Sequence, residues 1–328
     1  MNTREIFSAQ VFSTGVTDFE RLCLEMFRWQ AAENPVYAQY CEGLGVIPSG
    51  VGRLEEIPFL PVELFKSLEI KTGAYDPVRV FLSSTTGSST PSRHLLREER
   101  LYEESFTRGF TRQYGDPASW LLLALLPSYL EREGSSLVFM TEKLIRAAAL
   151  GSGFYLSHQG KLRSVLQQAA AAKQKTMLLG VSFALLDFAA AAPVCFPELV
   201  VMETGGMKGR RRELLRSELH SILEAAFMVP AIHSEYGMTE LLSQAYAPRN
   251  GLFECPPWMK ALWRDPTDPK EVKQLGTNGA LNLIDLANID SCAFLATSDL
   301  GHVYPDGRFE VLGRMDRSEW RGCNLMVS

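Results

Sequence analysis

A run rich in hydroxyl groups, Ser83 to Pro91 (Ser-Ser-Thr-Thr-Gly-Ser-Ser-Thr-Pro), directly follows the short apolar run Val78–Leu82. Such a strand-to-loop junction gathers backbone N–H groups and side-chain hydroxyls around one point, which is the arrangement that a polyphosphate requires. Clusters of serine, threonine and glycine are also common in plain surface loops, so this run alone leaves both interpretations open.

Two further segments with reactive side chains follow along the chain. The first, Ser234–Glu240, reads Ser-Glu-Tyr-Gly-Met-Thr-Glu and ends in a carboxylate, an oxygen ligand suited to Mg²⁺. The second, Thr297–Asp316, begins with Thr-Ser-Asp-Leu-Gly and ends with Gly-Arg-Met-Asp. Upstream, the turn Glu203–Lys208 contains two glycines after an apolar run, and small residues there let a flat ring approach the backbone.

In this order, the segments resemble the motifs of the adenylate-forming enzymes, which activate a carboxylic acid with ATP and Mg²⁺. The resemblance implies an ATP site made of three groups of residues. The residues around the phosphates would be Ser83, Ser84, Thr85, Thr86 and Gly87. The residues around adenine would be Gly205, Gly206, Tyr236 and Gly237, and those at the ribose Asp299 and Arg314. The resemblance also gives Thr239 a catalytic contact with the phosphates and Glu240 the role of Mg²⁺ ligand.

The hydroxyl-rich loop departs from the commonest form in that family, which has a lysine after the proline. Here Ser92 and Arg93 follow Pro91. Arginine keeps the positive charge and also binds phosphate, so the loop retains the same charge at a neighbouring position.

The C-terminal end indicates a narrower relationship. Typical members continue into a small mobile domain with a catalytic lysine, and this chain, which stops at Ser328, is expected to lack that domain. In length and in the segments Leu126–Leu130, Gly134–Leu137 and Gly205–Lys208, it resembles the acyl-protein synthetases of the bioluminescence fatty-acid reductase systems. That resemblance implies fatty-acid activation followed by transfer of the acyl group to Cys323.

A thiolate attacks an acyl-adenylate readily, and Arg321 beside Cys323 would favour the thiolate. The resemblance further implies delivery of the acyl group to a partner such as an acyl reductase. In place of the missing lysine, Lys208 or Arg93 is expected to assist adenylation because of its charge.

Three other functions stay open on the sequence. The acyl group could pass to coenzyme A or to another protein's thiol, or the chain could be a non-catalytic nucleotide-binding scaffold. A serine hydrolase is the third, because Gly180–Ala184 nearly matches the Gly-x-Ser-x-Gly nucleophile elbow around Ser182. Its acid and histidine would have to come from pairs such as Asp299 and His302.

The elements that must position these residues are predicted from short apolar runs separated by helical patterns. Runs of this kind without alternation are typical of strands buried on both faces. The predicted strands are Trp120–Leu126, Leu137–Met140, Met177–Val181 and Leu199–Met202. The predicted helices between them include Glu98–Arg112, Leu162–Lys173 and Arg211–Ala226. Alternating strands and helices favour an α/β fold with a parallel sheet flanked by helices, the N-terminal body of adenylate-forming enzymes by resemblance.

From about Asn250 the pattern changes to proline-rich loops and short alternating strands such as Arg308–Leu312. We therefore expect one adenylation domain over residues 1–328. Its α/β body would span about 1–250, and a β-rich subdomain with a C-terminal tail about 251–328.

Composition excludes several classes of protein. A net charge of −5 argues against a nucleic-acid partner, and the one dense basic cluster, Lys208 with Arg210 to Arg212, is more typical of a solvated helix face than of a binding patch. The six cysteines are scattered without a C-x-x-C pair, which argues against a disulfide framework or a zinc site. No signal sequence and no run of about 18 apolar residues occur, so we expect a cytoplasmic protein without a membrane span.

Overall fold

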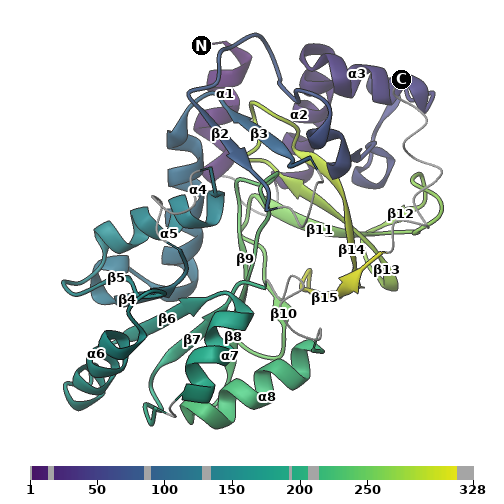
Figure 1. The fold of residues 1–328 in the computed structure, drawn as a ribbon. Coiled ribbons are helices and arrows are strands. Elements are labelled where there is room, and N and C mark those ends of the chain that lie inside the picture. Colours follow the sequence, from purple (N-terminus) through teal and green to yellow (C-terminus); the bar gives the residue numbers. More distant parts are fainter. Residues whose placement is uncertain are drawn as a thin grey trace.

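The computed structural model describes residues 2–13, 18–84, 90–127, 134–191, 194–205 and 214–315 (Figure 1). Within them lie two large sheets, a six-stranded one and a seven-stranded one, and one two-stranded hairpin. Figure 1 shows the six-stranded sheet with its helices in the lower left of the molecule and the seven-stranded sheet in the centre and at the right.

The six-stranded sheet has the order β5-β4-β6-β7-β8-β9. Its strands are β4 (Leu121–Leu125), β5 (Gly153–Phe154), β6 (Thr176–Gly180), β7 (Val200–Glu203), β8 (Ile232–Tyr236) and β9 (Ala245–Ala247). The first five in that order pair in parallel, and β9 is antiparallel to β8. All residues of β4 and β6 are buried, as expected for strands covered on both faces. The predicted parallel sheet is confirmed.

Helices cover both faces of this sheet. One face packs against α6 (Gln159–Ala171), α7 (Ser182–Ala191) and α8 (Arg216–Phe227), and the other against α4 (Glu99–Tyr114) and α5 (Ser136–Ala147). Alternate residues of β4 point to opposite faces of the sheet. Leu121 and Leu123 pack in the apolar cluster of α6 to α8. Leu122 and Ala124 pack in the cluster of α4 and α5. The sheet therefore separates two apolar cores.

One predicted strand is wrong. Leu137–Met140 lies in helix α5, not in a strand. The hydroxyl of Ser135 accepts a hydrogen bond from the Val138 N–H and caps the helix, and the buried residues then recur at helical spacing as far as Leu144. A four-residue apolar run does not distinguish a strand from a buried turn of helix.

The seven-stranded sheet has the order β10-β15-β14-β13-β11-β12, with β1 pairing in parallel with β14. Its strands are β1 (Leu60–Pro61), β10 (Leu252–Phe253), β11 (Met259–Arg264), β12 (Val272–Lys273), β13 (Gly276–Asp285), β14 (Phe294–Val303) and β15 (Phe309–Arg314). The β-rich last quarter is thus confirmed. The boundary near residue 250 stays a prediction, and β1 joins this sheet from far upstream.

The remaining elements precede or connect the sheets. The N-terminal helices are α1 (Thr3–Gln10), α2 (Phe19–Glu33) and α3 (Pro35–Gly43). Short 3₁₀ turns are η1 (Val11–Ser13), η2 (Pro48–Gly50), η3 (Leu54–Glu56), η4 (Val62–Lys66) and η5 (Pro117–Ser119). Strands β2 (Arg79–Leu82) and β3 (Arg93–Leu96) form the antiparallel hairpin that carries the hydroxyl-rich run.

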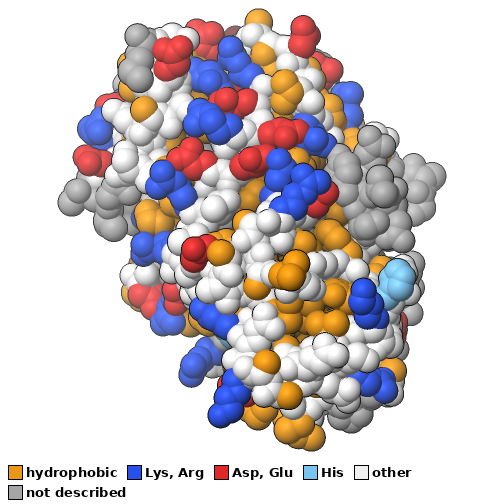
Figure 2. All heavy atoms as spheres, turned by 90° about the vertical axis from the view of Figure 1, so that its left-hand side faces the viewer, with side chains coloured by type: hydrophobic (Ala, Val, Ile, Leu, Met, Phe, Trp, Pro, Cys, Tyr) orange, Lys and Arg blue, Asp and Glu red, His pale blue; other side chains and the backbone are white. Residues whose placement is uncertain are grey.

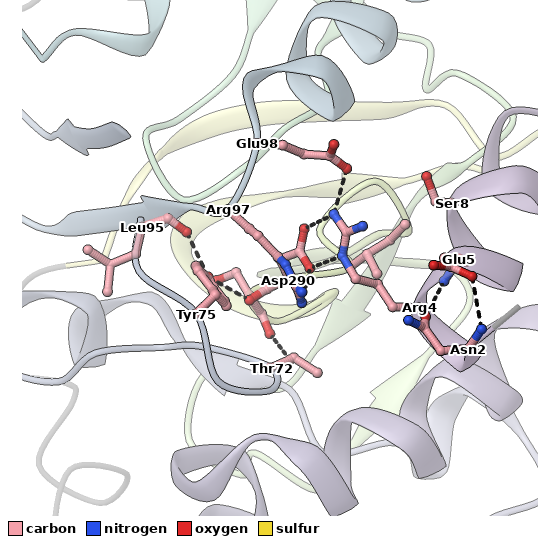
Figure 3. A network of polar contacts seen from close by, with 12 residues as sticks. Asn2, Arg4, Glu5, Ser8, Thr72, Tyr75, Leu95, Arg97, Glu98 and Asp290 are labelled. Atoms are coloured by element: carbon pink, nitrogen blue, oxygen red, sulfur yellow. Dashed lines mark hydrogen bonds and ion pairs between the residues drawn. The ribbon is translucent and has the colours of Figure 1, made fainter. Parts of the chain in front are cut away.

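Arg4 of helix α1 ties the N-terminus to the turn between β13 and β14 (Figure 3). Its Nε donates to Asp290 Oδ1 over 2.5 Å, and its Nη2 donates to Asp290 Oδ2 over 2.7 Å and to Glu98 over 2.5 Å. The hydrogen bond with Asp290 raises the pKa of the Arg4 guanidinium. Tyr75 adds a further bond from its hydroxyl to the Asp290 carbonyl.

Figure 2 shows the side of the molecule that carries α4 and α5, where Lys and Arg side chains are interspersed with Asp and Glu. The ion pairs of α4 and α5 include Arg108 with Glu104 and Arg146 with Glu142. Among the residues that the structure describes, no helix is both long and apolar enough to span a membrane.

Candidate functional site

The predicted Tyr-Gly-Met-Thr-Glu motif forms the connection between the last two strands of the parallel sheet. Strand β8 ends at Tyr236 and β9 begins at Ala245, so Thr239 and Glu240 lie in the segment between them. His94 Nδ1 donates to the Thr239 carbonyl over 2.7 Å, and Asn288 Nδ2 donates to the Glu240 carbonyl over 2.8 Å. Burial lowers the pKa of His94 to about 4, so its ring is neutral at pH 7 and Nδ1 carries a proton for this bond.

Asp285, at the end of β13, anchors the rest of this connection. Its Oδ2 accepts from the backbone N–H groups of Leu242 and Ser243 over 2.8 and 3.0 Å, and its Oδ1 accepts from the Ser243 hydroxyl over 2.6 Å. Oδ1 also accepts from the Ala287 N–H. Burial raises the pKa of Asp285 to about 6, and these four hydrogen bonds oppose that rise. The connection is therefore held by side chains from β3 and from the β13 end of the second sheet.

Tyr236 links this motif to the third predicted segment. Its hydroxyl donates to Asp299 Oδ2 over 2.7 Å, and Arg314 Nε donates to Asp299 Oδ1 over 3.2 Å. Asp299 and Arg314 are direct partners in the register of β14 and β15. Burial, together with the Asp299 charge, raises the pKa of Tyr236 well above its ordinary value, so the phenol stays protonated. Tyr236, predicted at the adenine, therefore forms one hydrogen-bonded chain with the two predicted ribose residues, Asp299 and Arg314.

Glu240 links the motif to the hydroxyl-rich run. The Ser92 hydroxyl hydrogen-bonds the buried Glu240 carboxyl, and burial raises the pKa of that carboxyl despite this bond. Across the base of the hairpin, the Ser83 hydroxyl accepts from the Ser92 N–H over 2.9 Å. Ser84 follows directly and is partly buried. The predicted phosphate loop thus begins beside the predicted Mg²⁺ ligand.

The glycine-containing turn after β7 is tied to the neighbouring strand. The Gly205 N–H donates to Glu203 Oε2 over 2.7 Å, and the Thr204 N–H donates to the Gly180 carbonyl over 3.1 Å. Gly205 has a φ of +70°, a backbone conformation that favours glycine. Burial alone would raise the pKa of Glu203, but hydrogen bonding from His220 and the Arg216 charge outweigh it and lower the pKa.

The geometry does not assemble the hydrolase triad considered from the sequence. Ser182 does follow a strand, at the start of α7, but its hydroxyl donates to the Glu203 carboxylate over 3.4 Å. Asp299 is engaged by Tyr236 and Arg314 in the other sheet. His302, on β14, accepts a hydrogen bond at its Nδ1 from the Asn278 N–H of β13. The proposed acid and histidine therefore have other partners than Ser182.

The donor set fits a magnesium ion bound together with phosphates. Among the described residues, no group of three or more His, Cys, Asp or Glu side chains is arranged as a metal site. Glu240 supplies one carboxylate, and Mg²⁺ is commonly held by one or two carboxylates plus substrate phosphates and water. Glu240 is therefore compatible with the predicted role.

Six predicted site residues lie outside the described residues: Thr85, Thr86, Gly87, Gly206, Lys208 and Cys323. Their roles remain predictions. Conversely, the sequence interpretation missed the residues that hold the Tyr-Gly-Met-Thr-Glu connection, namely His94, Asp285 and Asn288. No local signal identifies them, because each lies far along the chain from the motif that it supports.

Solved structures provide the comparison for this arrangement. A luciferase-like enzyme from the nonluminescent mealworm Zophobas morio matches 77% of this chain with a TM-score of 0.50 and 17% identity. McyG A-PCP, solved with phenylalanyl-adenylate, matches 76% with a TM-score of 0.50 and 12% identity. The fold is that of the N-terminal body of adenylate-forming enzymes. O-succinylbenzoate coenzyme A synthetase from Bacillus subtilis, in complex with AMP, matches 76% with a TM-score of 0.49 and 16% identity.

This adenylate-forming fold accounts for only part of those proteins. The chain spans 61% of the mealworm enzyme, 49% of McyG A-PCP and 52% of the B. subtilis synthetase. A scan against protein-family models gave no match, and a search of curated proteins gave none either.

Proposed function

We propose that this protein activates a carboxylic acid with ATP and then transfers the acyl group to a thiol. In the first step a carboxylate oxygen attacks the α-phosphorus of ATP, the bond to the β-phosphate oxygen breaks, and pyrophosphate leaves. In the second step a thiolate attacks the acyl carbonyl carbon of the adenylate, and AMP leaves. The protein's task is to align the carboxylate with the α-phosphate and to stabilise the departing charge.

The observation that carries this proposal is the meeting of three separated motifs. Tyr236 contacts Asp299 of the third motif, and Glu240 contacts Ser92 at the base of the first. Four positions separate Tyr236 from Glu240, so a nucleotide with its base near one and its phosphates near the other would touch all three segments.

In this proposal each group has a defined task. Asp299 and Arg314 would hold the ribose, which lies between the adenine at Tyr236 and the phosphates at Thr239. Glu240 would hold Mg²⁺, which neutralises charge on the leaving pyrophosphate. Arg93, at the start of β3, or Lys208 would add positive charge at the same phosphates.

We further propose that the acid is a fatty acid and that the acceptor thiol is Cys323, from which a partner such as an acyl reductase takes the acyl group. The support for this narrower function is the sequence resemblance to acyl-protein synthetases. Coenzyme A as acceptor is the alternative within the same chemistry.

The test is the intact mass of the purified protein after incubation with MgATP and a mixed panel of aliphatic and aromatic acids. Wild type, Cys323→Ala and Cys195→Ala are compared, because Cys195 is an exposed free thiol that controls for non-specific acylation. We expect a hydroxylamine-labile adduct in wild type and in Cys195→Ala, and none in Cys323→Ala.

Pyrophosphate release is measured in the same reactions. Release that requires coenzyme A, without an adduct, would replace Cys323 by an external acceptor. Binding of ATP without acid-dependent pyrophosphate release would instead support the nucleotide-binding scaffold and contradict the enzyme.

A further inference from the structure

Three buried polar side chains lie on the side of the parallel sheet that faces α4. Strand alternation places Ser234 toward α8, where it contacts His220, and Glu235 on the opposite face. Glu235 is paired in the β8–β9 register with Tyr246, and Gln244 precedes β9. Glu235, Gln244 and Tyr246 are 8%, 5% and 4% exposed.

Each of these three side chains has a polar group without a hydrogen-bond partner within the part of the chain that the structure describes, although the Gln244 amide does hydrogen-bond the Tyr102 hydroxyl. The Tyr246 hydroxyl and Gln244 Oε1 are buried with no partner there. Burial and the nearby charge of Glu203, without a hydrogen bond, set the pKa of Glu235. Buried polar groups in folded proteins are nearly always paired, so three unpaired ones in one place require an explanation.

The groups face a common point beside Gly237. A Cβ atom at Gly237 would lie 2.6 Å from Glu235 Oε1 and 3.7 Å from Gln244 Nε2. Tyr246 lies directly opposite Glu235 across the strand pair, and residues so placed have Cβ atoms about 5 Å apart. The absence of a side chain at Gly237 therefore leaves room for the Glu235 carboxyl, which a Cβ atom there would contact too closely.

The surrounding aromatic hydroxyls leave two groups of this cluster unsatisfied: Tyr102 hydrogen-bonds the Gln244 amide, but Gln244 Oε1 and the Tyr246 hydroxyl have no partner among the described residues. Tyr102 donates to the Ser136 carbonyl over 3.1 Å, and Tyr114 contacts His233 Nδ1 over 3.2 Å. Both belong to α4, which covers this face of the sheet. The wall opposite Glu235 therefore supplies apolar ring surface, with its own polar atoms already engaged.

The cluster lies close to the expected reacting centre. Gly237 is two residues from Thr239, so their Cα atoms are at most about 7 Å apart. An acid with its carboxylate near Thr239 would therefore need only a short body to place its far end beside Glu235.

We propose that Glu235, Gln244 and Tyr246 bind a hydrogen-bond-donating group, an amine or a hydroxyl, at the end of the acid substrate remote from its carboxylate. The preferred substrate is then an amino- or hydroxy-substituted acid, which narrows the fatty acid proposed above to one that carries such a group. This inference rests on the proposed adenylation. A donor is required because Gln244 Oε1 can only accept.

The state of Glu235 is consistent with such a ligand. Burial raises its pKa to about 8, so without ligand it is mostly a neutral carboxyl group at pH 7 that can donate or accept. An ammonium group would instead draw out the carboxylate form as an ion pair. The amine and hydroxyl ligands thus make different demands on Glu235 and can be separated by substitution.

The test uses two matched sets of acids: benzoate with its para-hydroxy and para-amino derivatives, and hexanoate with its ω-hydroxy and ω-amino derivatives. Acid-dependent ATP–pyrophosphate exchange gives kcat/KM for each acid. Thermal unfolding with each acid, in the absence of ATP, reports binding independently of the reaction. The proteins are wild type, Glu235→Leu, Glu235→Gln and Glu198→Gln, the last altering an exposed carboxylate as the control.

We expect wild type and Glu198→Gln to prefer a substituted acid over its unsubstituted parent by at least about tenfold in kcat/KM in one of the two sets. Glu235→Leu should bring that ratio close to one. Glu235→Gln should keep the preference for a hydroxyl and lose a preference for an amine, because glutamine cannot become charged.

The outcomes separate this inference from the proposed function. Exchange that is equally fast with unsubstituted acids would overturn the polar subsite and leave adenylation standing. No exchange, but stabilisation by a substituted acid that Glu235→Leu abolishes, would uphold the subsite and overturn adenylation. Neither exchange nor stabilisation with any of the acids would overturn both.

Discussion

The two faces of the β8–β9 strand pair differ in how their buried polar groups are hydrogen-bonded. On one face the Tyr236 hydroxyl, the Asp299 carboxylate and Arg314 form a continuous chain of hydrogen bonds. On the other face Glu235 and Tyr246 are just as buried, yet among the described residues their polar atoms have no hydrogen-bond partners. A paired network makes the fold rigid before any ligand arrives, whereas unpaired groups become satisfied only when a ligand binds. The first face is preorganised and the second face is incomplete.

The largest effect is expected where the paired network holds the motif in place. Asp285→Ala should lower the free energy of unfolding by about 3–5 kcal/mol, because it leaves the buried donors of Leu242 and Ser243 without an acceptor. Urea denaturation measures this loss. Asp306→Ala, at an exposed turn, is the control and should change stability by less than about 0.5 kcal/mol. A cost for Asp285→Ala as small as the control's would mean that water replaces the lost acceptor.

The same substitution on the two faces gives the sharpest comparison. Tyr236→Phe should cost about 1–3 kcal/mol, because it removes the donor to a buried carboxylate oxygen of Asp299. Tyr246→Phe should be neutral or stabilising by up to about 1 kcal/mol, because it removes a buried hydroxyl that has no partner among the described residues. Urea unfolding of both variants decides this, and equal costs would remove the difference between the faces.

The pH dependence of stability should also distinguish the faces. Burial raises the pKa of Glu235 from 4.5 to about 8, so the folded protein keeps a proton that the unfolded chain releases in this interval. Its contribution is complete below about pH 4.5 and declines as the pH rises toward 8. The melting temperature of wild type relative to Glu235→Gln should therefore fall by several degrees between pH 5.5 and 8.

Other buried groups titrate in both of these proteins and cancel in the difference. Burial raises the pKa of Asp285 to about 6, and it lowers the pKa of His94 and of His233 to about 4. The histidines contribute stability above about pH 6.5 that is lost as the pH falls toward 4. A wild-type curve parallel to that of Glu235→Gln would show that the Glu235 carboxyl is solvated.

The smallest effect on stability is expected at the outer end of the paired chain. The Arg314 side chain is 78% exposed, so Arg314→Met should change the free energy of unfolding by less than about 1 kcal/mol. If Arg314 holds the ribose as proposed, the KM for ATP in the exchange assay should rise several-fold in the same variant. An unchanged KM would limit Arg314 to orienting Asp299.

The sequence was sufficient to predict the parallel sheet because its strands are short, fully apolar runs separated by helices, as Met177–Val181 illustrates. It failed at Leu137–Met140, where the apolar run is too short to show its period and the capping Ser135 was not recognised. The register that pairs Asp299 with Arg314 could be expected only from the family resemblance, because no local pattern encodes a cross-strand partner.

For the candidate site, the sequence predicted which segments come together, and the described residues Tyr236, Asp299 and Arg314 do so. It did not predict the supporting contacts of Asp285 and His94, which depend on the folding of distant segments onto one another. The sequence could have indicated that Glu235 is unusual, because a carboxylate is rare in a strand whose neighbouring residues are buried. Strand alternation then places its side chain on the opposite face of β8 from Tyr236.

The contact between Arg4 and Asp290 has a consequence for biosynthesis. The two residues are 286 positions apart, and translation proceeds at about 5–20 residues per second, so Arg4 is made roughly 15 to 60 s before its partner. During that interval α1 can fold locally, but it cannot dock on the β13–β14 turn. Helix α1 is therefore fixed in place late, only after the chain as far as Asp290 has been made.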